Sequence, residues 1–268
     1  LMIKDGPVMW LNNSFRLIQL PLGLFGVAVA TITLPAMSRL ATEGVSEGFK
    51  VTLARGLKLV FLMTLPSAVG MALLAQPIIA LIYQRGNFTA EDTNMTALAL
   101  RTYAWGLVFY SGIKVLQPAF YAIERRYIPL LVSCAAVGVS AVCNYLTVYR
   151  WKLGHEFLAL GTSISAVVNF TLLFLAMRSV THGMKGRELA ANLCKLVVSC
   201  AAMAAVCWVC RLTLLDNFSH QRLLQKIGTL GATIFLAACV YFLMNSLLKN
   251  EEVGDMRRLL LRKLGRGK

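Results

Sequence analysis

The sequence has 268 residues, of which 57% are hydrophobic and only 15% are charged, and its formal net charge is +15. Soluble domains carry roughly a quarter charged residues, so this composition indicates lipid as a large part of the solvent and disfavours a soluble enzyme. The basic residues fall mostly between long apolar runs. Membrane topology therefore explains the positive charge better than nucleic acid does, and no nucleic-acid partner is expected.

Long apolar stretches recur along the whole chain. A transmembrane helix needs about 20 mostly apolar residues, because the hydrocarbon core is roughly 30 Å thick and an α-helix rises about 1.5 Å per residue. The alternation typical of barrel strands does not occur. The sequence predicts an all-α integral membrane bundle of about seven helices, at roughly 10–36, 55–83, 97–123, 127–149, 156–178, 189–212 and 225–248.

Lysine and arginine are distributed unevenly between the connecting segments. One set follows the first, third and fifth spans and continues in a basic tail at 249–268. A smaller set lies on the other side. By the positive-inside rule the larger set is cytoplasmic, which predicts a cytoplasmic C-terminus. The tail also sets leucines among basic residues at 253–268, a pattern typical either of an amphipathic helix on an anionic membrane surface or of a solvated tail.

Local signals mark one helix start and several irregular points in the spans. Thr89 and Asp92 have the spacing of a capping box, which predicts a helix start before the third span. Prolines within spans remove backbone donors and bend helices. Candidates for kinks or hinges are Pro21, Gly23, Gly26, Pro66 and Pro118.

Cations occur inside the predicted membrane region without anions. Arg16 lies on the first span, and Arg101 and Lys114 lie on the third, whereas all twelve acidic residues fall in loops, at span ends or in the tail. A lysine at the bilayer centre costs about 2.5–3.5 kcal/mol, so Lys114 is expected to face a cavity. Two interpretations of Arg16 and Lys114 stay open: contact with an anionic ligand, or topology anchoring and helix–helix contact.

No group of residues predicts catalysis or metal binding. The three histidines lie in loops, no serine or cysteine has a recognisable catalytic partner, and no phosphate-binding glycine loop precedes a helix. Cys207 and Cys210 have the CxxC spacing but lack a second ligand pair, so they are interpreted as apolar filler. The expectation is a protein that is not an enzyme and has no metal or cofactor.

Several motifs resemble those of one family. The run RLIQLPLGLFGVAVATITLP at 16–35 is followed in order by LPSA at 65–68, RGNFT at 85–89 and KVLQPAFYA at 114–122. These motifs resemble the MurJ/MviN family of lipid II flippases, within the multidrug/oligosaccharidyl-lipid/polysaccharide exporter superfamily. The likeness covers about the first half of the chain, and beyond Pro129 it lies mainly in hydropathy and span count.

The resemblance implies a particular architecture and location. Family members have fourteen transmembrane helices in two lobes and move lipid II, an undecaprenyl-diphosphate-linked peptidoglycan precursor, across the bacterial inner membrane by alternating access. On this basis residues 1–178 match family helices eight to twelve, 179–248 add two further helices, and 249–268 form a basic cytoplasmic tail. The N-terminal lobe, a partner of this half, would lie outside the present sequence.

The resemblance also implies roles for individual residues. Arg16 matches an arginine of the family's central cavity and becomes a candidate contact for the diphosphate of lipid II, with Lys114 supplying further cavity charge and Arg101 as another candidate. Gln19 is a further candidate for diphosphate binding; it stands where many relatives have glutamate, so a role that needs a carboxylate there is in doubt. Alternative functions are a multidrug/cation antiporter, which the absence of buried acids disfavours, and a non-transporting membrane partner of cell-wall enzymes.

Overall fold

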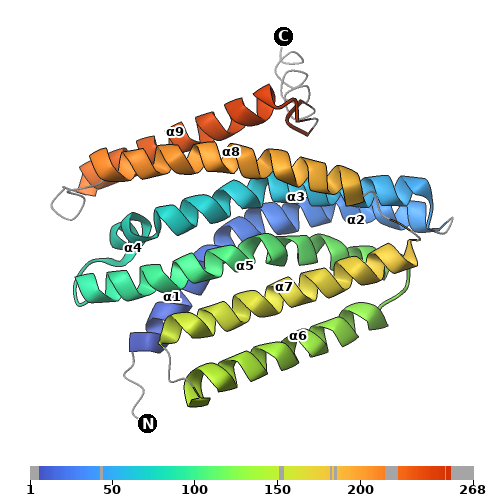
Figure 1. The fold of residues 1–268 in the computed structure, drawn as a ribbon, viewed down its shortest axis with the longest axis horizontal. Coiled ribbons are helices and arrows are strands. Elements are labelled where there is room, and N and C mark those ends of the chain that lie inside the picture. The colour runs from blue at the N-terminus through green and yellow to red at the C-terminus, as the bar shows by residue number, and fades with distance from the viewer. Residues whose placement is uncertain are drawn as a thin grey trace.

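The computed structural model describes residues 6–42, 45–150, 154–181, 183, 186–214, 223–250 and 252–254, and these residues are almost entirely helical. The long helices lie side by side and alternate in direction along the chain (Figure 1). The elements are α1 (Gly6–Pro21), η1 (Leu22–Val27), α2 (Ala28–Ala41), α3 (Glu47–Leu73), α4 (Ala75–Tyr83), α5 (Ala90–Ala122), α6 (Tyr127–Tyr145), η2 (Leu146–Arg150), α7 (His155–Val180), α8 (Gly186–Thr213) and α9 (Leu223–Leu247), where η1 and η2 are π-helical.

The predicted all-α membrane fold is confirmed. Each of the seven predicted spans falls on a long helical stretch, the first on α1–η1–α2 and the second on α3 and α4. Within the described residues, six stretches are long and apolar enough to cross a membrane: Gly6–Ala41, Glu47–Leu73, Tyr127–Tyr145, Glu156–Val180, Gly186–Thr213 and Leu223–Leu247.

Helix α5 forms the centre of the bundle. With 33 residues it has the length to cross a membrane, but it is not among those six stretches. It carries Arg101 and Lys114 together with many hydroxyl side chains, and α1, α2, α3 and α7 pack around it. Its neighbours, not lipid, cover most of its surface, which explains how a more polar helix is tolerated there.

The N-terminus of α5 is fixed by the predicted capping box, and it lies earlier than the predicted span. The Asp92 backbone N–H donates to Thr89 Oγ1 at 3.2 Å, and the Thr89 backbone N–H donates to Asp92 Oδ2 at 2.9 Å. Trp10 Nε1 of α1 donates to the other carboxylate oxygen at 2.8 Å. These donors, those of Thr89 first, hold the pKa of Asp92 below its ordinary value because they stabilise the carboxylate. The helix therefore begins at Ala90, seven residues before the predicted 97.

The second predicted span is two helices. Helix α3 ends at Leu73 and α4 begins at Ala75, with Leu74 between them in a non-helical conformation. Pro77 lies in the first turn of α4, where its missing N–H is tolerated because first-turn donors have no intrahelical partner. Helix α3 continues through Pro66.

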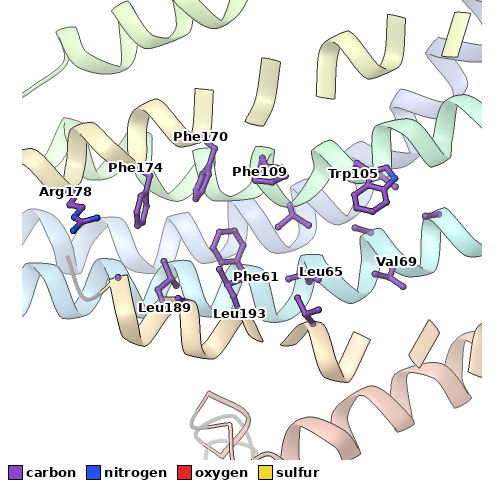
Figure 2. A pocket seen from close by; sticks show the side chains of 17 residues that line it. Phe61, Leu65, Val69, Trp105, Phe109, Phe170, Phe174, Arg178, Leu189 and Leu193 are labelled. Atoms are coloured by element: carbon purple, nitrogen blue, oxygen red, sulfur yellow. The ribbon is translucent and has the colours of Figure 1, made fainter. Parts of the chain in front are cut away.

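An elongated apolar pocket of about 650 Å³ lies among α3, α5, α7 and α8 (Figure 2). Aromatic rings from three of these helices lie along it, and Arg178 marks one end. The prediction of separate transmembrane helices contained no such feature, because a pocket depends on which side chains meet across helices.

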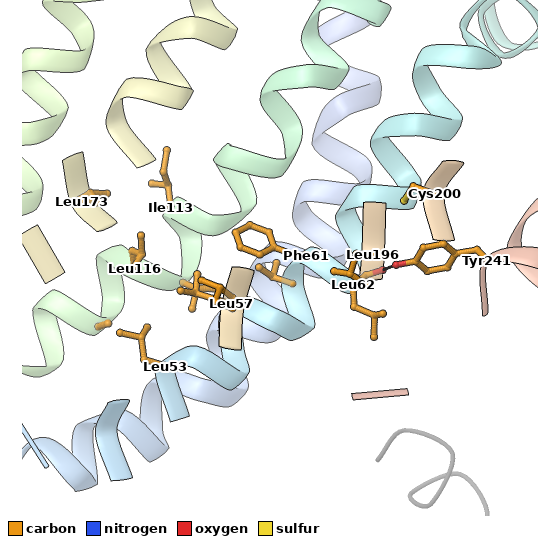
Figure 3. Packing of buried hydrophobic residues seen from close by; sticks show 14 of the residues in the cluster. Leu53, Leu57, Phe61, Leu62, Ile113, Leu116, Leu173, Leu196, Cys200 and Tyr241 are labelled. Carbon is orange, nitrogen blue, oxygen red and sulfur yellow. Dashed lines mark hydrogen bonds between the residues drawn. The ribbon is translucent and has the colours of Figure 1, made fainter. Parts of the chain in front are cut away.

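Helix α3 lies in a buried apolar core that also joins α5, α7, α8 and α9 (Figure 3). Tyr241 of α9 is 1% exposed, and its hydroxyl donates to the Leu62 carbonyl of α3 at 2.7 Å. In a regular α-helix that carbonyl would accept from the N–H four residues later, which Pro66 lacks. Tyr241 thus supplies the donor that Pro66 removes, and it fixes α9 against α3.

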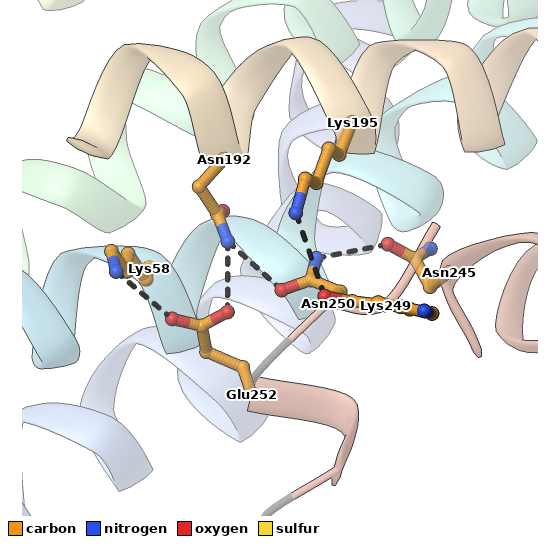
Figure 4. A network of polar contacts seen from close by, with 7 residues as sticks. All are labelled: Lys58, Asn192, Lys195, Asn245, Lys249, Asn250 and Glu252. Carbon is orange, nitrogen blue, oxygen red and sulfur yellow. Dashed lines mark hydrogen bonds and ion pairs between the residues drawn. The ribbon is translucent and has the colours of Figure 1, made fainter. Parts of the chain in front are cut away.

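A polar network ties the segment after α9 to α3 and α8 (Figure 4). Lys58 Nζ of α3 lies 3.4 Å from Glu252 Oε1, and Asn192 Nδ2 of α8 donates to Glu252 Oε2 at 2.8 Å and to Asn250 Oδ1 at 3.0 Å. Asn250 donates to Asn245 Oδ1 at 3.1 Å. The amphipathic pattern predicted for the tail lies almost entirely outside the described residues.

Candidate functional site

The first helix presents Arg16 and Gln19 on one exposed face. Residues three apart lie on the same side of an α-helix, and the intervening Leu17 and Ile18 are buried. Ser14, on the buried side, donates to the Thr96 carbonyl of α5 at 2.7 Å. This contact fixes the rotation of α1, so Arg16 and Gln19 are directed away from the bundle core.

The chain changes its winding directly after Pro21. Residues Leu22–Val27 form the π-helical segment η1, and such segments occur frequently at functional sites. Gly26 is buried against α5: a Cβ built there would lie 3.6 Å from Ser111 Cα and 3.7 Å from Lys114 Cγ. Gly23, in contrast, faces open space, with no atom within 4 Å of a Cβ built there.

Lys114 reaches the same region from α5. Its side chain is exposed between the buried neighbours Ile113 and Val115, and its stem passes beside Gly26. Arg16 precedes Gly26 by ten residues, roughly 15 Å of helix. We call Arg16, Gln19 and Lys114 the cation face. In the part of the chain that the structure describes, none of the three side chains has a hydrogen bond or an ion pair.

Arg101 does not belong to the cation face. It precedes Lys114 by thirteen residues, which places it roughly 140° around α5. It is half-buried and lies within electrostatic range of Arg211 of α8. Lys114 thus lies beside Gly26, in the segment that follows Arg16 and Gln19, whereas Arg101 points to another side of α5.

The predicted hinge residues lie in different settings. Pro21 immediately precedes η1, while Pro66 and Pro118 lie inside helices that continue through them. Pro118 has no backbone N–H, so it cannot donate the intrahelical hydrogen bond that the Lys114 carbonyl would accept in a regular α-helix. The role of these residues as hinges stays a prediction.

Two contacts that position the site were missed by sequence reasoning. Ser14 and Trp10 bind α1 to α5 through Thr96 and Asp92, and neither residue type signals a long-range partner by itself. Among the described residues there is no cluster of three or more histidine, cysteine, aspartate or glutamate side chains that could hold a metal ion. Cys207 and Cys210 are buried in α8.

An apolar bundle of membrane-spanning helices, with unpartnered cations and an irregular helical segment among its described residues, defines the class of this chain as a polytopic membrane protein. Comparisons with known proteins identify the family of the chain. Residues 2–227 match the family model described as lipid II flippase MurJ. The chain therefore belongs to the MurJ family.

Curated relatives support this assignment. The chain is 32% identical over 253 residues to a "Probable lipid II flippase MurJ" of Vibrio cholerae, covering 92% of this chain and 47% of the relative. It is 33% identical over 270 residues to a protein of that name from Rhizobium tropici, covering 97% and 49%. The "Lipid II flippase MurJ" of Burkholderia cenocepacia is 31% identical over 240 residues, covering 90% and 46%. The chain spans about half the length of these relatives.

A solved structure shares the fold. The chain superposes on "Lipid II flippase MurJ, inward closed conformation" with a TM-score of 0.73 and 22% identity, over 93% of this chain and 48% of that one. The helical arrangement of this chain is therefore that of one half of a MurJ structure.

Proposed function

We propose that the chain serves in the translocation of lipid II across the bacterial inner membrane by alternating access, as the C-terminal half of a two-lobe flippase. Membership of the MurJ family and the coverage of about half of each relative support this role. The observation that carries the proposal is the cation face, because its cations have no protein partner among the described residues and the ligand of a lipid II flippase carries a diphosphate.

The cation face has the chemistry to receive a diphosphate. The Arg16 guanidinium presents a planar fork of donors that can bind phosphate oxygens in pairs, and Lys114 adds a mobile point charge. Gln19 contributes amide donors between them without a competing negative charge. Since Arg16 and Lys114 are roughly 15 Å apart along the bundle, they would contact the diphosphate at different depths as it crosses.

The exposure of these cations also supports a cavity. A charged side chain facing lipid at the bilayer centre is costly, so Lys114 requires water or a ligand on its exposed side. A second lobe opposite α1, η1 and α5 would enclose such a water-filled space. Leu20, Leu24 and Ile32, which are 67%, 66% and 76% exposed, would then be covered or face the prenyl chain.

Alternating access needs flexible points next to the ligand. We place them at Pro21, Gly23 and Gly26, because π-helical hydrogen bonds around η1 can rearrange without unfolding the helix. Pro66 and Pro118 are weaker candidates, since the helices continue through them. Translocation requires no covalent step, so the proposal assigns no catalytic residue and no cofactor.

The proposed topology places the C-terminus in the cytoplasm. The ends of α2, α5 and α7 and the start of α8 lie at the same end of the bundle (Figure 1). Arg39, Arg125, Arg178 and Arg187 lie there, and the positive-inside rule assigns that end to the cytoplasm. A reporter fused to each terminal region, active on only one side of the membrane, checks the orientation.

The activity is tested by depleting the full-length protein that contains this chain, in cells with no other lipid II flippase. Lipid II exposed on the outer leaflet is then labelled with a reagent that does not cross the membrane. The proposal predicts that exposure falls while total lipid II is maintained or rises. Unchanged exposure after depletion would exclude the proposed function.

A further inference from the structure

The apolar pocket of Figure 2 has the form of a slot with one charged end. We define the lipid slot by Phe61, Trp105, Phe109, Phe170, Phe174 and Arg178. The Phe170 ring lies 5.8 Å from the rings of both Phe61 and Phe109 and 5.9 Å from that of Phe174, measured between centroids. Three helices thus contribute a continuous aromatic wall, with the remaining lining almost entirely aliphatic.

Arg178 gives the slot a direction. It lies in the last turn of α7, and its exposed side chain lines the slot at the end where the basic connecting segments gather. Its guanidinium has no ion pair or hydrogen bond among the described residues. Trp105, 75% exposed, lies towards the opposite end near the middle of α5.

The lipid slot is separate from the cation face. Trp105 and Lys114 are nine residues apart on α5, which is two and a half turns and places them on opposite sides of the helix. Phe109 lies roughly 140° from Lys114. A ligand held in the slot therefore does not contact the cations that we assign to the substrate diphosphate.

The length of the slot matches one leaflet of a bilayer. Arg178 to Phe170 spans eight residues of α7, and Phe109 to Trp105 spans four of α5, which together correspond to roughly 18 Å. One leaflet measures about 15 Å of hydrocarbon plus a headgroup layer of several ångströms. The slot thus extends from headgroup depth to about the middle of the membrane.

We propose that the slot binds one acyl chain of an anionic phospholipid, whose phosphate pairs with Arg178. The charge complementarity favours a lipid with a net negative phosphate headgroup, because a guanidinium binds phosphate oxygens in pairs and attracts net negative charge. A zwitterionic lipid offers the same chain but places an ammonium group beside the arginine. The site lies in the leaflet on the side of the basic segments.

Trp105 supplies a spectroscopic test at the far end of the slot. The full-length protein is placed in phosphatidylcholine nanodiscs with a small fraction of phosphatidylglycerol or phosphatidylcholine brominated in mid-chain. Quenching that disappears in Trp105→Phe is attributed to Trp105. The proposal predicts several-fold stronger Trp105 quenching by brominated phosphatidylglycerol than by brominated phosphatidylcholine.

Two variants and one control test whether the anionic lipid binds in the lipid slot. Arg178→Gln should abolish the preference for phosphatidylglycerol, and Ala190→Phe, which fills the slot without changing charge, should do the same. Arg39→Gln removes an arginine at the same end but outside the slot, and it should keep the preference. Equal quenching by both lipids, or a preference that survives Arg178→Gln, would overturn the proposal.

A competition experiment distinguishes the two sources of a phosphate-bearing chain. Unlabelled phosphatidylglycerol should restore Trp105 fluorescence, and a polyprenyl diphosphate should do so only at a much higher concentration. If the polyprenyl diphosphate competes more strongly, the slot belongs to a prenyl chain and the assignment to phospholipid is wrong. That result would leave the proposed flippase function intact.

Discussion

Tyr241→Phe tests how the bundle tolerates a proline in α3. The substitution removes the hydroxyl that donates to the Leu62 carbonyl at 2.7 Å and leaves the ring in place. Because Pro66 provides no intrahelical donor, that carbonyl then has no hydrogen-bond partner in a site where Tyr241 is 1% exposed. An orphaned buried carbonyl costs about 1–3 kcal/mol, and interhelical hydrogen bonds in membranes reach about 1.7 kcal/mol. We expect a loss of about 1–2 kcal/mol.

A double-mutant cycle isolates this effect from the general consequences of each change. Pro66→Ala restores the N–H, so Leu62 regains an intrahelical donor and the hydroxyl becomes less important. Unfolding in mixed detergent–SDS micelles, followed by tryptophan fluorescence, measures the free energy of each variant. Tyr241→Phe should cost about 1 kcal/mol less in the Pro66→Ala background, a coupling within the range seen for contacting residues.

The control is Tyr121→Phe, which removes an exposed hydroxyl without a hydrogen bond in the described structure. It should change stability by less than about 0.5 kcal/mol. An equal cost of Tyr241→Phe in the parent and in the Pro66→Ala background would refute the idea that the tyrosine compensates for the proline.

Three further changes test other contacts. Gly106→Ala places a Cβ 2.9 Å from Ser163 Oγ and 3.1 Å from Ser163 Cα, so it should destabilise the protein by about 1–3 kcal/mol in thermal unfolding. The control is Gly138→Ala, which has open space around its Cβ and should be neutral or stabilising. Equal effects would contradict the close α5–α7 packing. Glu252→Gln leaves Lys58 without its anion and should lower the free energy of unfolding by about 1–3 kcal/mol in the same measurement. An unchanged free energy of unfolding would show that the network does not hold the segment after α9.

The pH dependence of stability tests the carboxylate of the capping box at the start of α5. The pKa of Asp92 is lower in the folded protein than in the unfolded chain, so its contribution to stability is present above about pH 4 and is lost as the pH falls through the folded value. Asp92→Asn should therefore be less stable than the parent at pH 7, with a difference that shrinks on acidification. A difference independent of pH would contradict the role of the carboxylate.

The length and apolar character of continuous stretches were sufficient to predict most of the fold. Apolar runs located the seven helical stretches, because a run of about twenty apolar residues in a membrane has few alternatives to an α-helix. Thr89 and Asp92 predicted a helix start that the structure confirms. Pro77 predicts a kink in the second span, but the complete break at Leu74, three residues earlier, was not predicted, because apolar residues lie on both sides of it. The predicted span boundary at 97 lies seven residues inside α5 because the first residues of the helix are polar, whereas the capping box marks its true start.

The site could be predicted in part. Unpaired cations within apolar runs identified Arg16 and Lys114, because the absence of acidic residues can be read from the sequence directly. The separation of Arg101 from Lys114 follows from their spacing of thirteen residues in one helix, whereas the proximity of Arg101 to Arg211, 110 residues away along the chain, depends on the packing of α5 and α8. The lipid slot depends on aromatic rings from three helices, and only their i, i+4 spacing within α5 and α7 left a trace in the sequence.

The most direct test of the central claim removes the charge of the cation face in cells that depend on the full-length protein. Arg16→Gln combined with Lys114→Gln keeps polar side chains of similar size but leaves no cation for a diphosphate. With expression and thermal stability equal to those of the parent, the double variant should lose outer-leaflet exposure of lipid II, while Arg39→Gln should retain it. Exposure at the level of the parent in the double variant would contradict the proposal that the cation face moves the diphosphate.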